Sequence, residues 1–160
     1  MIFVTVGTHE QAFDRLVRTV DDLVANRVID DDVYVQTGYS TYKPTHCKHS
    51  QWVAFQEMSQ YMTQADIVIT HGGPSSFIEA MAAGKVPVVV PRQSQFNEHV
   101  NDHQVEFVRA VAERQGGIIP VYDISELAGA IERARYITSV EYTPHNPEFC
   151  RQFQELIEAL

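Results

Sequence analysis

The chain has 160 residues, of which 44% are hydrophobic, which is enough for one well-buried core but not for two domains. Its formal net charge of −9 argues against a nucleic-acid partner and against direct binding to anionic lipid. Two cysteines, Cys47 and Cys150, are too few for a disulfide framework and fit a reducing compartment.

Apolar runs of strand length alternate with helical patterns along the chain. This alternation predicts an α/β fold with a Rossmann-like, doubly wound parallel sheet. In such a sheet, ligands bind beyond the carboxyl ends of the strands. The predicted elements are strand 2–6, helix 10–27, strand 33–36, an irregular stretch 38–51, strand 52–55, helix 56–64, strand 66–70, helix 75–83, strand 86–90, helix 97–114, strand 117–121 and helix 123–135.

The first turn of interest follows the opening strand and contains Gly7, Thr8 and His9. This is the usual place for a phosphate turn, although the GxGxxG pattern of dinucleotide-binding proteins is missing. An imidazole can exchange protons near neutral pH, so His9 is the candidate catalytic residue, either toward a leaving diphosphate or as base on an acceptor hydroxyl. The alternative is a loop residue that only fixes the turn.

A second turn, His71-Gly72-Gly73-Pro74-Ser75-Ser76, joins a predicted strand to a predicted helix. Free N–H groups at a helix start favour an anion, and glycine lets a ligand approach the backbone closely. Glu79 lies on the same helical face as the two serines, where its carboxylate can accept a hydrogen bond from a ribose hydroxyl. The alternative is that Ser76 and Glu79 form a capping box at an ordinary tight turn.

A third, polar segment follows the predicted strand 86–90. Its side chains supply the donors and acceptors that sugar hydroxyls need, namely Asn97, Glu98, His99, Asp102 and Gln104. The alternative is a solvated helix start whose acidic residues complement the helix dipole. His99 and His103 share a helical face, but the residues around them do not form the HExxH pattern, so no metal site is predicted.

Three signatures together indicate a family: Val4-Thr5-Val6-Gly7-Thr8-His9 with Phe13-Asp14-Arg15-Leu16, then residues 71–76 with Glu79-Ala80, then Pro91-Arg92 with residues 97–104. On these residues the chain resembles the donor-binding half of inverting GT-B glycosyltransferases, in particular the glycosyltransferase family 28 C-terminal domain. The small soluble subunits of two-component bacterial galactosyl- and glucuronosyltransferases fit best. The eukaryotic dolichol-linked N-acetylglucosaminyltransferase subunit is a more distant relation, because a different residue set tends to follow its opening Gly-Thr.

The resemblance implies a UDP-sugar-dependent hexosyltransferase that moves a hexose or hexuronic acid to a lipid-linked saccharide in exopolysaccharide or capsule synthesis, without a metal or other cofactor. Gly7, Thr8 and residues 71–76 would hold the diphosphate, Glu79 the ribose, and the polar residues of 97–104 the sugar. A GT-B site lies between two domains, so the resemblance also implies a membrane-associated, acceptor-binding partner subunit. The chain would be cytoplasmic and recruited to the membrane's inner face by that partner, and homo-oligomerisation is left open.

Residues 1–136 are expected to form the nucleotide-sugar-binding domain. Residues 137–160 are expected to form a tail with an amphipathic helix that docks on the domain or on the partner. The chain starts on a predicted strand and has no apolar run of about 20 residues, so neither a signal peptide nor a membrane span is expected. Residues 46–49 are expected to be a mobile loop, and the acidic residues of 21–32 a solvated face.

Two other functions remain open at this point. The chain could be a non-catalytic enhancer of a partner glycosyltransferase, in which case the Glu79→Ala substitution would leave the activity of the pair nearly unchanged. It could also be related to the sugar-nucleotide epimerases, which share the two-domain fold. Those enzymes need both domains in one chain and additional carboxylates, so the length of this chain counts against them.

Overall fold

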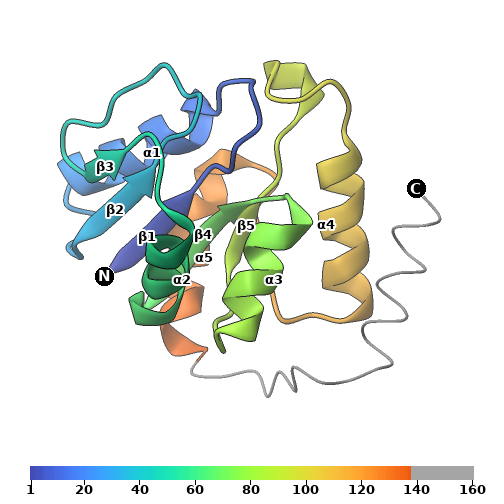
Figure 1. The fold of residues 1–160 in the computed structure, drawn as a ribbon. Helices are drawn as coiled ribbons and strands as arrows, with labels where there is room; N and C mark the ends of the chain where they lie inside the picture. The colour runs from blue at the N-terminus through green and yellow to red at the C-terminus, as the bar shows by residue number, and fades with distance from the viewer. Residues whose placement is uncertain (138–160) are drawn as a thin grey trace.

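The computed structural model describes residues 1–137 (Figure 1), so the predicted tail helix lies outside the described residues. One parallel sheet has the order β3-β2-β1-β4-β5-β6. Its strands are β1 (Ile2–Thr5), β2 (Val33–Gln36), β3 (Lys48–Ser50), β4 (Ile67–His71), β5 (Val88–Val90) and β6 (Ile119–Pro120). The helices are α1 (Asp14–Ala25), α2 (Phe55–Gln64), α3 (Pro74–Ala82), α4 (His103–Arg114) and α5 (Leu127–Tyr136), with short 3-10 turns η1 (Ser94–Phe96) and η2 (Ile124–Glu126).

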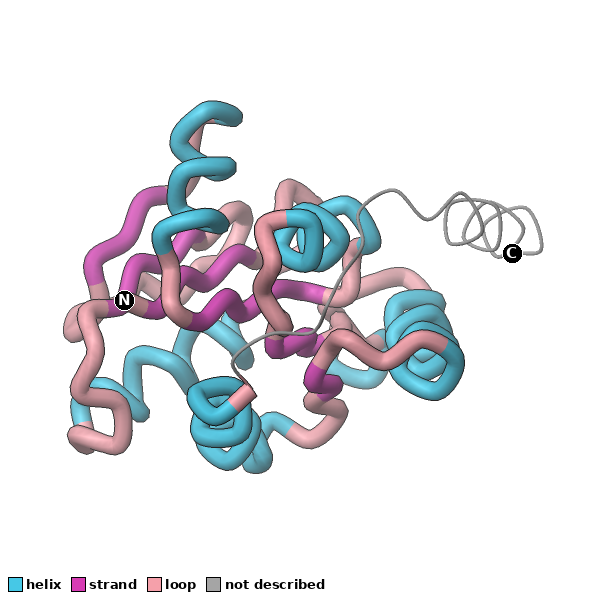
Figure 2. Tube along the Cα trace, turned by 90° about the horizontal axis from the view of Figure 1, so that it is seen from below, coloured by secondary structure: helices cyan, strands magenta, loops and turns pink. Residues whose placement is uncertain are grey.

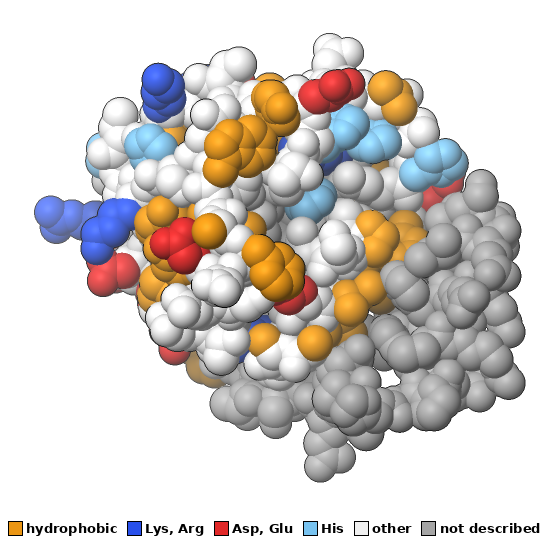
Figure 3. All heavy atoms as spheres, viewed as in Figure 1, with side chains coloured by type: hydrophobic (Ala, Val, Ile, Leu, Met, Phe, Trp, Pro, Cys, Tyr) orange, Lys and Arg blue, Asp and Glu red, His pale blue; other side chains and the backbone are white. Residues whose placement is uncertain are grey.

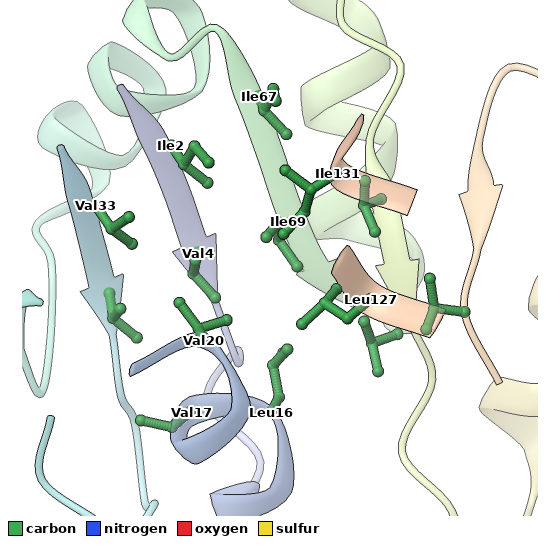
Figure 4. Packing of buried hydrophobic residues seen from close by; sticks show 14 of the residues in the cluster. Ile2, Val4, Leu16, Val17, Val20, Val33, Ile67, Ile69, Leu127 and Ile131 are labelled. Atoms are coloured by element: carbon green, nitrogen blue, oxygen red, sulfur yellow. The ribbon is translucent and has the colours of Figure 1, made fainter. Parts of the chain in front are cut away.

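The strand order reverses between β1 and β4, which confirms the predicted doubly wound, Rossmann-like sheet. Helices cover both faces (Figure 2). On one face α1 and α5 bring Leu16, Val20 and Leu127 against β1 and β4, as Figure 4 shows. The other face packs against α2, α3 and α4. Alternate strand residues point to opposite faces, and apolar side chains on both faces bury the central strands β1, β4 and β5. Within residues 1–137, no helix is long and apolar enough to cross a membrane.

Two predicted elements near the carboxyl edge of the sheet were placed wrongly. The third strand is Lys48–Ser50, inside the stretch expected to be irregular or mobile, and residues 52–54 are not a strand. This polar strand pairs with β2 through its backbone, so it carries no apolar alternation. Helix α4 begins at His103 and not at residue 97, because the polar residues 97–102 form a loop after η1.

Helix α1 also begins later than predicted, at Asp14 in place of residue 10. Just before the helix, the guanidinium of Arg92 donates to the backbone carbonyl oxygens of Gln11 and Ala12, at 2.7 and 3.4 Å. The loop after β1 is therefore held open at the carboxyl edge of the sheet.

Two aspartates on α1 hold the long connection between β2 and β3, which has no helix of its own. The carboxylate of Asp14 accepts hydrogen bonds from the backbone N–H groups of Thr41 and Tyr42, at 2.7 and 2.9 Å. That of Asp21 accepts from the N–H groups of Thr45 and His46, at 3.0 and 2.7 Å. Asp21 is 1% exposed, so its assignment to a solvated face was wrong.

Burial alone would raise the pKa of Asp21, but the hydrogen bonds from the loop outweigh it and hold the pKa well below its ordinary value. The ionised carboxylate therefore stabilises the fold above the unfolded pKa of about 4. This contribution is lost as the pH falls through the lowered folded pKa.

We predict that Asp21→Asn lowers the free energy of unfolding by about 2 kcal/mol at pH 7, because a neutral amide replaces a charged acceptor of several hydrogen bonds. The difference from the wild type should shrink below about pH 4. Urea unfolding at pH 7 and pH 3 measures both effects. Asp22→Asn is the matched control, since Asp22 is the exposed neighbour. Equal effects of the two substitutions would contradict the assigned role of Asp21.

Candidate functional site

A hollow of about 200 Å³ opens at the carboxyl edge of the sheet. Around this edge, at the top of Figure 3, hydrophobic and histidine side chains gather on the surface. The hollow joins the turn after β1 to the turn after β4, as the positions of the two predicted phosphate turns implied. It is lined by Thr5, Gly7, Thr8, Gln36, Trp52, Val53, Met58, His71, Ser75, Ser76 and Glu79.

The imidazole of His71 lies at the base of the hollow, between two glycines. Gly7 has φ +75°, and a Cβ there would lie 2.5 Å from Cε1 of His71. A Cβ at Gly73 would overlap Nε2 of the same ring. The close approach of the ring therefore requires both glycines, and at Gly7 the positive φ favours glycine as well.

His71 is neutral at physiological pH. Burial lowers its pKa to about 3, and the nearby guanidinium of Arg92 acts in the same direction. Its Nδ1 is buried and has no hydrogen-bond partner in the described part of the chain. A neutral imidazole brings no charge to a bound ligand.

Helix α3 starts directly at the hollow. Its N-cap is Gly73 and Pro74 occupies the first turn, while no side chain caps the helix. The alternative capping box between Ser76 and Glu79 is therefore not formed. Glu79 instead accepts a hydrogen bond from the hydroxyl of Ser59 at 2.8 Å and keeps its place in the wall of the hollow. The N–H groups of the first turn remain available to an anion.

Three of the predicted sugar-binding residues support the backbone of the neighbouring loops. Glu98 is 3% exposed, and its carboxylate binds the guanidinium of Arg15 and the N–H of Gln93. The side-chain oxygen Oε1 of Gln104 accepts from the backbone N–H groups of Gly72 and Arg92, both at 3.1 Å. These two bonds join the turn after β4 to the turn after β5. Asp102 accepts from the N–H and hydroxyl of Ser94 in η1.

The other predicted residues of this segment lie beside His9. The rings of His9 and His99 are stacked, with centroids 4.6 Å apart and an angle of 19° between their planes. Burial lowers the pKa of His99, and His9 adds to this effect. Asn97 is exposed in a left-handed conformation, with φ 56°. A contact of any of these residues with a sugar stays a prediction.

Sequence reasoning missed the residue that ties the first and third signatures together. Arg92 is fully buried, and its guanidinium donates to the carbonyl oxygens of Val6, Gln11 and Glu98, at 2.9, 2.7 and 3.1 Å. It also lies over the ring of Phe13, 4.7 Å from its centroid. The only available signal was an arginine directly after an apolar strand.

Gln36 and Trp52 also line the hollow. The buried amide of Gln36 accepts from the hydroxyl of Thr5 at 2.7 Å and donates to the carbonyl of Gly7 at 3.1 Å. Trp52 is 45% exposed and contacts Tyr39 edge to face, with centroids 5.1 Å apart. Trp52 therefore lies outside the hydrophobic core. In residues 1–137, no group of three or more His, Cys, Asp or Glu is arranged to hold a metal ion.

Comparisons with known proteins agree with this geometry. The model of the glycosyltransferase family 28 C-terminal domain matches residues 1–135, so the chain belongs to this family. A curated relative from Bdellovibrio bacteriovorus is 32% identical over 76 residues, which cover 48% of this chain and 20% of that protein. Its name is UDP-N-acetylglucosamine–N-acetylmuramyl-(pentapeptide) pyrophosphoryl-undecaprenol N-acetylglucosamine transferase.

Solved structures share the fold. The glycosyltransferase of kitacinnamycin superposes with a TM-score of 0.60 at 17% identity and covers 97% of this chain. The glycosyltransferase SnogD from Streptomyces nogalater superposes with a TM-score of 0.50 at 18% identity and covers 84% of this chain. The aligned part amounts to 37% and 38% of those two proteins, so this chain corresponds to well under half of each.

We predict that Arg92→Lys lowers the free energy of unfolding by about 3 kcal/mol, because an ammonium cannot satisfy carbonyls in several directions and leaves some buried and unpaired. Chemical denaturation measures the loss. Arg114→Lys, at an exposed position of α4, serves as the control. An unchanged stability of the Arg92 variant would show that the guanidinium does not hold the loops together.

Proposed function

We propose that the chain is the donor-binding and catalytic subunit of an inverting glycosyltransferase. It transfers a hexose or hexuronic acid from a UDP-sugar to a lipid-linked saccharide in exopolysaccharide or capsule synthesis. The observation that carries the proposal is the hollow itself, which brings an anion-binding turn, a carboxylate and an exposed tryptophan together at the carboxyl edge of the sheet.

The groups that line the hollow suit the parts of a nucleoside diphosphate. The backbone at Gly7, the imidazole of His71 and the first turn of α3 suit the diphosphate. The carboxylate of Glu79 suits the ribose hydroxyls. Trp52 offers an exposed aromatic face on which a base can stack.

The size of the hollow supports a site completed by another polypeptide. Its volume of about 200 Å³ lies below the range of about 300–1,000 Å³ that small-molecule sites occupy. A UDP-sugar would therefore extend beyond it. Five exposed apolar side chains lie near this edge, namely Tyr39, Trp52, Phe55, Phe96 and Val100. A membrane-associated acceptor-binding subunit would cover them and would recruit the chain to the inner face of the membrane.

The name of the curated relative supports the classes of donor and acceptor in this proposal. Its name combines a UDP-sugar donor with an undecaprenol-linked acceptor. We carry over the donor class and the lipid-linked acceptor, but not the N-acetylglucosamine. In the proposed reaction the sugar is displaced once, with inversion, and the backbone groups around Gly7 and α3 stabilise the charge that develops on the diphosphate. His9 is the candidate base, and no metal is expected to take part.

We predict saturable binding of UDP by the full-length chain, with ADP binding at least tenfold more weakly. Glu79→Ala should lower the affinity for UDP about tenfold, because it removes hydrogen bonds of roughly 1.4 kcal/mol to the ribose. Isothermal titration calorimetry measures both affinities. Glu113→Ala, on the exposed part of α4, is the matched control. Absence of UDP binding up to millimolar concentration would contradict the donor-binding role and favour the enhancer alternative.

Trp52→Ala should weaken the binding of UDP by about 1–3 kcal/mol, which is the range for base stacking on an aromatic side chain. Inorganic pyrophosphate should bind the variant and the wild type equally well, because it has no base to stack. The same calorimetric titrations provide the comparison. Equal UDP affinity in variant and wild type would remove Trp52 from the nucleotide site.

A further inference from the structure

The side chain of Gln11 connects the loop after β1 to the loop after β5. Its amide nitrogen donates to the carbonyl oxygen of Asn97 at 3.1 Å, and its carbonyl oxygen lies 2.9 Å from Nε2 of His9. Asn97 turns that carbonyl toward Gln11 from a left-handed backbone conformation, which asparagine tolerates well. The backbone of Gln11 is itself fixed, because its carbonyl accepts from the buried guanidinium of Arg92 at 2.7 Å.

These contacts determine which nitrogen of His9 carries the proton. The carbonyl of Asn97 can only accept, so the amide nitrogen of Gln11 must face it. The carbonyl oxygen of Gln11 then faces His9 and can also only accept. Nε2 of His9 must therefore be the protonated nitrogen. The opposite amide orientation would place two oxygens against each other across the contact with Asn97.

Nδ1 is then the basic nitrogen of the neutral ring. No hydrogen bond within residues 1–137 uses it. The stacked ring of His99 covers one face of His9 at 4.6 Å and restricts the ring's tilt. Nδ1 of His99 is itself occupied, since it lies 3.4 Å from the backbone N–H of Asn101. The arrangement thus leaves one ring nitrogen with acceptor capacity beside the hollow.

We propose that Gln11 is a positioning residue that locks His9 as the Nε2-protonated tautomer, so that Nδ1 takes the proton of the acceptor hydroxyl. The catalytic part of this inference rests on the proposed function. As the acceptor oxygen bonds to the anomeric carbon, the bond from that carbon to the diphosphate breaks, and its electron pair leaves with UDP. The hydroxyl proton passes to Nδ1, while Nε2–H stays bonded to Gln11.

The contact between Gln11 and His9, called the relay below, suits the formation of an imidazolium at His9. The amide oxygen of Gln11 already faces the Nε2–H bond, which becomes more polar when Nδ1 gains its proton. Because His99 is held neutral by burial, the stacked ring does not add a like charge.

The test is the tautomer of His9, read from long-range proton–nitrogen correlation spectra of the 15N-labelled full-length chain. In the wild type we expect the proton on Nε2 and an unprotonated Nδ1. Gln11→Ala should leave a mixture of both tautomers. Gln11→Glu should keep the wild-type tautomer and shift the protonation of His9 to a pH about one unit higher, because a carboxylate then faces Nε2–H. Gln60→Ala, at an exposed position of α2, is the control.

A proton on Nδ1 in the wild type would overturn the proposal, and this reading does not depend on how well any variant folds. So would a tautomer that stays unchanged in Gln11→Ala. The same samples are titrated with UDP, and Gln11→Ala should bind it as tightly as the wild type does. A wild-type chain that shows the expected tautomer but binds no UDP would leave the relay intact and refute the proposed function alone.

Discussion

The carboxyl edge of this sheet depends on one buried cation. Burial lowers the pKa of Arg92 to about 10, which still leaves the guanidinium charged at neutral pH. A buried charge is costly unless it is paired and hydrogen-bonded. Here the carbonyl oxygens of Val6, Gln11 and Glu98 supply the compensation, together with the face of Phe13. Since these carbonyls belong to two separate segments, the connection after β1 and the loop after β5, the same bonds that satisfy the charge also fix these segments to each other.

The remaining loop contacts follow from the need to satisfy backbone groups outside regular structure. In place of strand or helix partners, the N–H groups of Gly72 and Arg92 use the amide of Gln104, and that of Gln93 uses the carboxylate of Glu98. The polar density after β5 therefore has a structural cause. Carboxylates and amides that hold loop backbone have fewer free lone pairs with which to bind a ligand.

The sequence predicted what is encoded locally and missed what depends on distant partners. Gly73 and Pro74 predict a strand-to-helix turn from neighbouring residues alone, and the structure has that turn between β4 and α3. The role of Arg92 depends on carbonyls 81 and 86 positions away along the chain. The contact of Gln11 with Asn97 likewise spans 86 positions. Lys48–Ser50 forms a strand by backbone pairing alone, and Asp21 is buried only because a loop closes over it. No periodicity in the sequence reports such contacts.

The charge inside the hollow bears on how the proposed donor would be held. Its lining contains Glu79 but no lysine or arginine, and His71 is neutral. A helix N-terminus contributes the equivalent of roughly half a positive charge, while the diphosphate of a UDP-sugar carries about two negative charges. Backbone amides can bind the phosphate oxygens, but they cannot neutralise them fully. The remaining positive charge has to come from groups beyond this lining. The proposed partner subunit could supply it through a basic surface facing the hollow, so charge as well as volume supports that part of the proposal.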